Sequence, residues 1–173
     1  YNTTRFICMN PSEADSINTT ILHRQFDETQ IIHIGLRSTP TDNEALLRWS
    51  TYNWDMNRLK VIAIGATVML TQSCDISTGA VAGAIGVVTA VAYRHGNRSE
   101  GLANVYIRLT SGSTLCVNRS KTVTTMYRDT NSHTRRHQMS TFPFVLAYAI
   151  TGHNLTSLTS DDNIVLILKE PFR

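Results

Sequence analysis

The residues of this sequence that could do chemistry are mostly cations, and they gather in one stretch. Between Ala92 and Phe142, eight arginines and lysines oppose only two carboxylates, Glu100 and Asp129, which leaves a net charge of +6. A local excess of positive charge attracts polyanions, above all nucleic acid. Charge alone leaves a solvated basic loop open as the alternative. The cations are Arg94, Arg98, Arg108, Arg119, Lys121, Arg128, Arg135 and Arg136.

Common catalytic arrangements are absent from the sequence. None of its lysines lies in a G-x-x-x-x-G-K-[ST] loop, which would cradle the phosphates of ATP with backbone amides and a lysine. No G-x-S-x-G nucleophile elbow is present. The glycines between residues 79 and 86 do not have the G-x-G-x-x-G spacing, so we interpret Gly79, Gly83 and Gly86 as turn residues between strands. We assign no catalytic residue.

Metal ligands are equally sparse. His133 and His137 would share one face of a helix, but two arginines lie between them and no third ligand is near. We therefore expect no metal site. The cysteines are far apart and odd in number, which predicts reduced thiols of an intracellular protein. They are Cys8, Cys74 and Cys116.

Length and composition predict a folded chain. The 173 residues are 42% hydrophobic and 17% charged, against about 25% charged in an average domain. A chain of this length can bury a core without disulfides or metals. No apolar run approaches the roughly 18 residues that a membrane helix needs, so we expect no membrane association.

The first residues predict an α/β unit. Arg5 to Met9 is a short apolar strand candidate, and Asn10 and Pro11 end it. A helix is expected next, because Ser12 and Asp15 resemble a capping pair and apolar residues follow at helical spacing. Strand, turn and helix in this order are typical of α/β folds.

The middle of the chain predicts an all-β module. From Leu59 onward, short β-branched runs alternate with Gly, Asn and Ser, which indicates a small antiparallel barrel of about five strands. Ser120 to Thr141 is polar and basic and is expected to be an exposed connection. Phe144 to Ile150 and Ile164 to Leu168 are predicted buried strands, the second of the parallel, doubly covered type. The order predicts an α/β fold with an inserted all-β module.

Four segments resemble one family. Leu59 to Val91 resembles the PIF-type (petite-integration-frequency, RecD-like) 5′-to-3′ DNA helicases and their Helitron transposon relatives. FPFVLAYAITGH, Phe142 to His153, is similar to their motif V region, and ICMNPSEADSIN, Ile7 to Asn18, to their motif IV region. The tail from Asn163 to Phe172 matches the strand and K-E-P-F that follow motif V. The first segment matches at Gly65, Val68, Met69, Leu70, Asp75, Ile76, Gly79, Gly83, Gly86 and Val88.

The resemblance implies a partial second RecA-like domain of the P-loop NTPase type, split by an SH3-like barrel insertion. Residues 1–60 would begin the RecA-like domain, residues 61–125 would form the barrel, and residues 126–173 would be the basic connection and the return. Thr151 and His153 would contact the DNA backbone, with Asn10 nearby. Electrostatic contacts to DNA would come from Arg119, Lys121, Arg128, Arg135 and Arg136.

The family resemblance also implies a missing partner. Motifs I, II and VI are absent, so we expect a C-terminal fragment of a longer helicase, which would join an N-terminal RecA-like domain and single-stranded DNA. ATP and Mg²⁺ would serve the full-length protein, and none is expected for this chain alone. Placement in the nucleus or mitochondrion follows from the family.

Departures from the family pattern keep two alternatives open. Asn154, Thr156 and Ser157 replace the lysine, glutamine and glycine of motif V, and Ala82 replaces an asparagine. One alternative is a catalytically dead mobile-element remnant that retains DNA binding. The other is a simple β-barrel module that binds nucleic acid, or a protein partner without nucleic acid.

Overall fold

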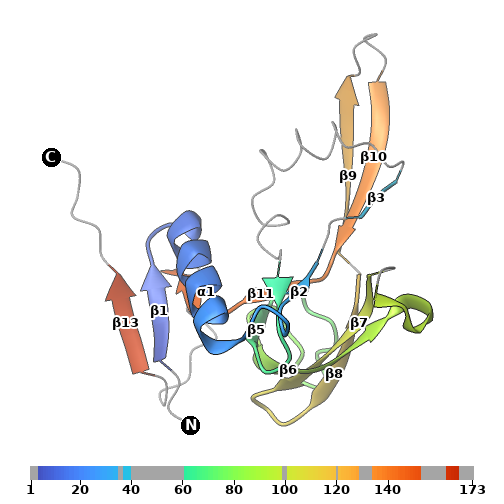
Figure 1. Ribbon diagram of the computed structural model, residues 1–173. Helices are drawn as coiled ribbons and strands as arrows, with labels where there is room; N and C mark the ends of the chain where they lie inside the picture. The colour runs from blue at the N-terminus through green and yellow to red at the C-terminus, as the bar shows by residue number, and fades with distance from the viewer. Residues whose placement is uncertain are drawn as a thin grey trace, which may run out of the picture.

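A computed structural model describes residues 4–34, 37–39, 61–98, 101–119, 121–128, 134–152 and 163–167. For residues 37–39, 121–128 and 134–139 the description is of the backbone. The molecule combines a small parallel sheet and one helix with a larger antiparallel sheet, from which a long hairpin extends (Figure 1). The α/β character and the all-β character expected from the sequence are therefore both present.

The helix α1 (Pro11–Gln25) begins at an asparagine cap. Asn10 has extended backbone angles, and its Oδ1 accepts hydrogen bonds from the backbone N–H groups of Ser12 (2.9 Å) and Glu13 (3.2 Å). Proline at the first helical position loses no hydrogen bond, because that N–H would have no partner in the helix. The predicted cap of Ser12 and Asp15 is wrong by two residues, since asparagine is among the strongest N-caps.

The parallel sheet places β1 (Thr4–Cys8) between β12 (Ala149–Thr151) and β13 (Asn163–Ile167). Helix α1 packs on β1 and β12. The parallel orientation expected for the last strand is confirmed. Its expected burial on both faces is wrong, because β13 lies at the sheet edge beyond the helix. Ile164, Val165 and Leu166 are 47%, 41% and 61% exposed.

The antiparallel sheet has five strands in the order β11-β5-β6-β7-β8. Its members are β11 (Phe144–Leu146), β5 (Thr67–Leu70), β6 (Ile85–Tyr93), β7 (Leu102–Leu109) and β8 (Thr114–Asn118). A short pair, β2 (Ile32–His33) with β4 (Val61–Ile62), lies beside it. A 3-10 turn, Arg94–Gly96, follows β6.

A hairpin replaces the exposed connection predicted for Ser120 to Thr141. Strand β9 (Lys121–Arg128) pairs antiparallel with β10 (Thr134–Thr141), and β3 (Arg37–Thr39) pairs with the other side of β10. The threonines, valine and tyrosine of β9 favour a strand, although the segment is polar. Figure 1 shows this hairpin extending away from the five-stranded sheet.

The apolar run Phe144 to Ile150 is divided between the two sheets and is not a single strand. The N–H of Ala147 still donates to the carbonyl of Thr67 in β5 (3.0 Å). The carbonyl of the next residue, Tyr148, instead accepts from the N–H of Phe6 in β1 (2.9 Å). All seven residues are buried, because they lie where the two sheets meet. A continuous apolar run does not reveal such a change of partner.

The core has three adjoining parts. The largest lies under the five-stranded sheet and includes Ile62, Leu70, Ile107, Phe142 and Phe144. A second part joins the two sheets through six residues, and a third packs α1 on the parallel sheet. The second contains Ile7, Met69, Ile85, Val145, Ala147 and Ile150, and the third contains Cys8, Ala14 and Ala149.

Of the three glycines that the sequence assigned to turns, two lie in a loop and the third lies inside a strand. Gly79 and Gly83 have φ angles of +78° and +91° in the loop that joins β5 to β6. Gly86 lies inside β6, where a Cβ would come within 2.6 Å of Ile107 Cγ2 and 2.7 Å of the Arg108 carbonyl oxygen. Glycine is required there because β6 and β7 approach closely.

Among the described residues, no helix has the length and apolar character needed to cross a membrane.

Candidate nucleic-acid interface

The carboxyl ends of the three parallel strands meet at one edge. Cys8, the last residue of β1, is level with Thr151 of β12 and with Ile167 of β13. Open sheets of this kind bind ligands outside the carboxyl ends of their strands. Asn10 follows β1 at this edge and Gly152 follows β12, so the fold brings together two segments more than 140 positions apart.

The amino end of α1 lies at the same edge, but its backbone donors are already used. Pro11 has no N–H, and those of Ser12 and Glu13 both point to Asn10 Oδ1. Glu13 also places a carboxylate in the first turn, where it favours the helix and repels an anion. The described residues therefore do not form the phosphate cradle that ATP needs. Asn10 acts first as a helix cap, and only its amide nitrogen could reach a phosphate.

Thr151 and Gly152 form the other side of the edge. Thr151 is 6% exposed at the end of β12. Gly152 is exposed, and no atom lies within 4 Å of the position a Cβ would occupy. The backbone at Gly152 is therefore open to an approaching chain. His153, also expected to contact DNA, lies outside the described residues.

Asn18 holds this edge in place and was not singled out as a functional residue by the sequence. Its side chain is buried in α1, donates from Nδ2 to the carbonyls of Leu146 (3.3 Å) and Ala149 (2.8 Å), and accepts the N–H of Ala149 at Oδ1 (2.8 Å). These bonds fix the segment where the chain changes sheets, two residues before Thr151. A polar residue on the apolar stripe of the helix was the available signal.

Tyr148 adds a second connection between the sheets. Its hydroxyl oxygen accepts a hydrogen bond from the backbone N–H of Thr67 at 3.3 Å. Burial raises the pKa of Tyr148, and this hydrogen bond opposes the rise. The phenol is therefore neutral at physiological pH and acts as a structural contact.

Arg119, one of the predicted cations, is used inside the fold. Its guanidinium carbon lies 5.0 Å from the ring centroid of Phe142, and its Nη1 donates to the carbonyl of Ser140 at 3.3 Å. A cation over an aromatic face is a stabilising contact. The structure thus gives Arg119 a packing role, which does not favour the electrostatic contact predicted for it.

The other four predicted cations belong to the β9–β10 hairpin. Arg135 and Arg136 are consecutive in β10 and pair with Tyr127 and Met126 of β9. Arg128 pairs with Thr134 at the same end of the hairpin, and Lys121 pairs with Thr141 at the other end. Three of the four are thus close in register, on an element separate from the parallel sheet.

The structure does not support the helical arrangement in which His133 and His137 could bind a metal ion together. His137 lies in β10, a strand, so a spacing of four does not place it on one helical face with His133, which lies outside the described residues. Within the described ranges, no group of three His, Cys, Asp or Glu residues could hold a metal ion.

Comparison with solved structures relates this arrangement to Pif1 helicases. Unliganded Pif1 from Bacteroides sp. aligns with 95% of this chain and 46% of its own, at a TM-score of 0.58 and 22% identity. Bacteroides Pif1 in complex with ADP-AlF3 and single-stranded DNA aligns with 99% of this chain and 35% of its own, at 0.61 and 22%. Pif1 helicase from Candida albicans aligns with 91% of this chain and 37% of its own, at 0.59 and 17%.

These comparisons define the fold class. The chain has a Pif1-helicase-like fold, and it spans less than half the length of these neighbours. No family model and no curated protein matches the sequence.

Proposed function

We propose that this chain is the part of an ATP-dependent 5′-to-3′ DNA helicase of the Pif1 type that grips single-stranded DNA. The sheet of β1, β12 and β13 with helix α1, here called the parallel unit, would be a partial second RecA-like domain. The five-stranded sheet would be an SH3-like barrel inserted into it. Unwinding during repair, recombination or transposon replication would be the task of the whole protein.

The observation that carries this proposal is the strand-end edge, where the carboxyl ends of β1, β12 and β13 meet. It joins Asn10, Thr151 and the open backbone at Gly152, in a fold shared with a Pif1 that was solved with single-stranded DNA. Contacts at such an edge would be made to phosphates, and they would position the strand without reading its sequence. The basic hairpin would add attraction of longer range.

ATP and Mg²⁺ would be bound mainly by the N-terminal RecA-like domain, which is the proposed protein partner. The capped start of α1 and the absence of a phosphate loop from the sequence support a role for this chain in grip without hydrolysis. A second candidate is a DNA-binding remnant without a motor. The replacement of the motif V residues by Asn154, Thr156 and Ser157 favours it.

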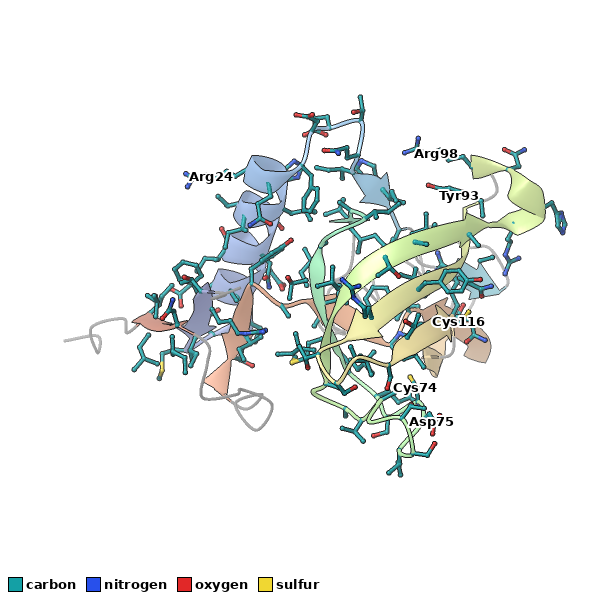
Figure 2. All side chains as sticks on the ribbon, turned by 90° about the horizontal axis from the view of Figure 1, so that it is seen from below. Arg24, Cys74, Asp75, Tyr93, Arg98 and Cys116 are labelled. Atoms are coloured by element: carbon teal, nitrogen blue, oxygen red, sulfur yellow. The ribbon has the colours of Figure 1, made fainter. Side chains whose placement is uncertain are left out.

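Salt-dependent binding to a short oligothymidine tests the proposal. Between about 50 and 200 mM salt, six phosphate contacts to a single strand should weaken binding by roughly 300-fold, because counterions are released. Arg135→Glu with Arg136→Glu should lower both the affinity and the salt slope. Arg24→Glu, a charge reversal on the exposed end of α1, is the matched control (Figure 2). Absent binding, or binding that ignores salt, contradicts the proposal.

ATP hydrolysis separates the two candidates. Supplying the N-terminal RecA-like domain should produce DNA-stimulated ATPase activity if the chain is part of a motor. DNA binding without such activity identifies the remnant.

A further inference from the structure

Strands β6, β7 and β8 present one buried face and one open face. The inner face carries Val88, Val105, Ile107 and Val117, all at most 3% exposed. The outer face carries mostly short or polar residues, more than half of them exposed. They are Val87, Thr89, Ala90, Ala92, Asn104, Tyr106, Arg108, Thr114, Cys116 and Asn118.

Tyr106 is the central residue of this outer face. Its direct partners are Ala90 in β6 and Cys116 in β8, both short and both exposed. Tyr106 itself is half-buried, so its side chain stays partly accessible between these two short neighbours. Such a ring on an open sheet is the platform on which a base of single-stranded nucleic acid stacks.

Arg108 supplies a cation beside the ring. It is exposed, lies two positions from Tyr106 on the same face of β7, and pairs with Val87 and Thr114. The sequence from 85 to 118 holds three arginines and a single carboxylate, Glu100, which lies outside the strands. No acid of the three strands therefore competes with a phosphate for Arg108.

The outer face is poor in the side chains that a protein partner would bury. The large hydrophobic residues that are exposed among the described residues lie elsewhere, in the parallel unit and in the loops around β5. An aromatic ring, a cation and short polar neighbours fit a nucleic-acid strand better than an apolar protein surface.

We propose that the outer face of β6, β7 and β8 is a second binding surface for single-stranded DNA, with a base stacked on Tyr106 and a phosphate at Arg108. It is distinct from the strand-end edge, because that edge belongs to the other sheet, at the carboxyl ends of β1, β12 and β13. The choice of single-stranded DNA as ligand rests on the proposed function.

Substitutions at the two residues measure each contribution. Tyr106→Ala should weaken oligothymidine binding by roughly 5-fold to 100-fold, the usual cost of losing one stacked base. Tyr106→Phe keeps the ring and should bind as the parent chain does, which separates stacking from a folding defect. Arg108→Glu should weaken binding and lower the salt slope by about one, whereas Arg24→Glu should do neither.

Photocrosslinking locates the surface without a variant. The full chain is crosslinked to an oligothymidine that carries 5-iodouracil and is then digested with trypsin. Crosslinks in the peptide Ser99 to Arg108, which contains Tyr106, support the proposal. Crosslinks confined to peptides around Asn10 or Gly152 overturn it and uphold the proposed function. No crosslink and no binding overturn both.

Discussion

The parallel unit and the five-stranded sheet differ in how their strands are paired and in how completely their apolar residues are buried. Consecutive strands β5 to β8 pair with their neighbours in sequence and bury one complete face. The parallel unit joins β1 to strands more than 140 positions away and leaves β13 exposed. The antiparallel sheet is thus held by local pairing, while the parallel unit depends on a few contacts between distant segments.

Asn18 makes contacts of that kind with its side chain. One buried amide makes three hydrogen bonds, to the last residue of β11 and the first residue of β12. Each of those backbone groups would be buried without a partner if the amide were removed. The strand-end edge, where DNA contact is proposed, therefore depends on a residue that would not itself touch DNA.

Asn18→Leu should give the largest effect. Three backbone groups lose their partner at about 1–3 kcal/mol each, so we expect a loss of roughly 3–9 kcal/mol of unfolding free energy. Urea denaturation measures the loss, and Thr19→Leu on the exposed side of the same helix is the matched control. A loss under about 1 kcal/mol would show that the parallel unit is held by other contacts.

Thiol labelling shows which region opens in this variant. Cys8 is 1% exposed in the parallel unit, and burial, followed by the nearby Glu13 carboxylate, raises its pKa. Cys116 is exposed on β8. Labelling of Cys8 should accelerate in Asn18→Leu while that of Cys116 stays unchanged.

Gly86→Ala should give the next largest effect and should act on the antiparallel sheet. The added Cβ would meet the backbone of Arg108, so β6 and β7 must separate. Overpacking of this kind costs about 1–3 kcal/mol. Gly152→Ala, which has open space around it, should leave the thermal midpoint almost unchanged. Equal midpoints for the two variants would contradict the close approach of β6 and β7.

Asn10→Ala should cost less, about 1 kcal/mol, because it removes the helix cap. Asn10→Asp keeps an acceptor oxygen at the start of α1 and should retain the stability. If the alanine variant unfolds at the same urea concentration as the parent chain, Asn10 is not needed as a cap. DNA binding by the Asp variant then reports on the loss of the amide nitrogen together with the added negative charge.

Protonation of Asp75, or its replacement by asparagine, should have the smallest effect on stability, confined to the loop between β5 and β6. The Ser77 hydroxyl (2.6 Å) and then the Ser77 N–H (3.0 Å) donate to its carboxylate and lower its pKa. A lowered pKa in the folded state means that the contribution is complete above the ordinary aspartate pKa and is lost as the pH falls through the lowered value. Titration of the Ser77 amide by NMR should show that transition, and Asp75→Asn should abolish it.

The sequence predicted the local elements better than their partners. The first strand and helix, and the short strands of the antiparallel sheet, follow from side-chain periodicity and turn residues. The change of sheet at Ala147 and the exposed edge at β13 do not, because an apolar run indicates burial without indicating what covers it. The hairpin of β9 and β10 was not predicted, because its sequence is polar and basic and was interpreted as an exposed connection.

The candidate edge was predicted only in part. Asn10 and Thr151 came from the family resemblance, and the structure adds that they lie at one edge with an open Gly152. Asn18 and Tyr106 were not singled out, because their roles arise from pairing between strands and from contacts across more than 120 positions.

Charge placed at Gly152 tests the central claim most directly. The position is exposed and open, so a longer side chain should be accommodated without loss of stability. If the strand-end edge holds the DNA backbone, oligothymidine affinity should fall for Gly152→Glu, change little for Gly152→Gln and rise for Gly152→Lys. Three folded variants with equal affinities would contradict DNA binding at this edge.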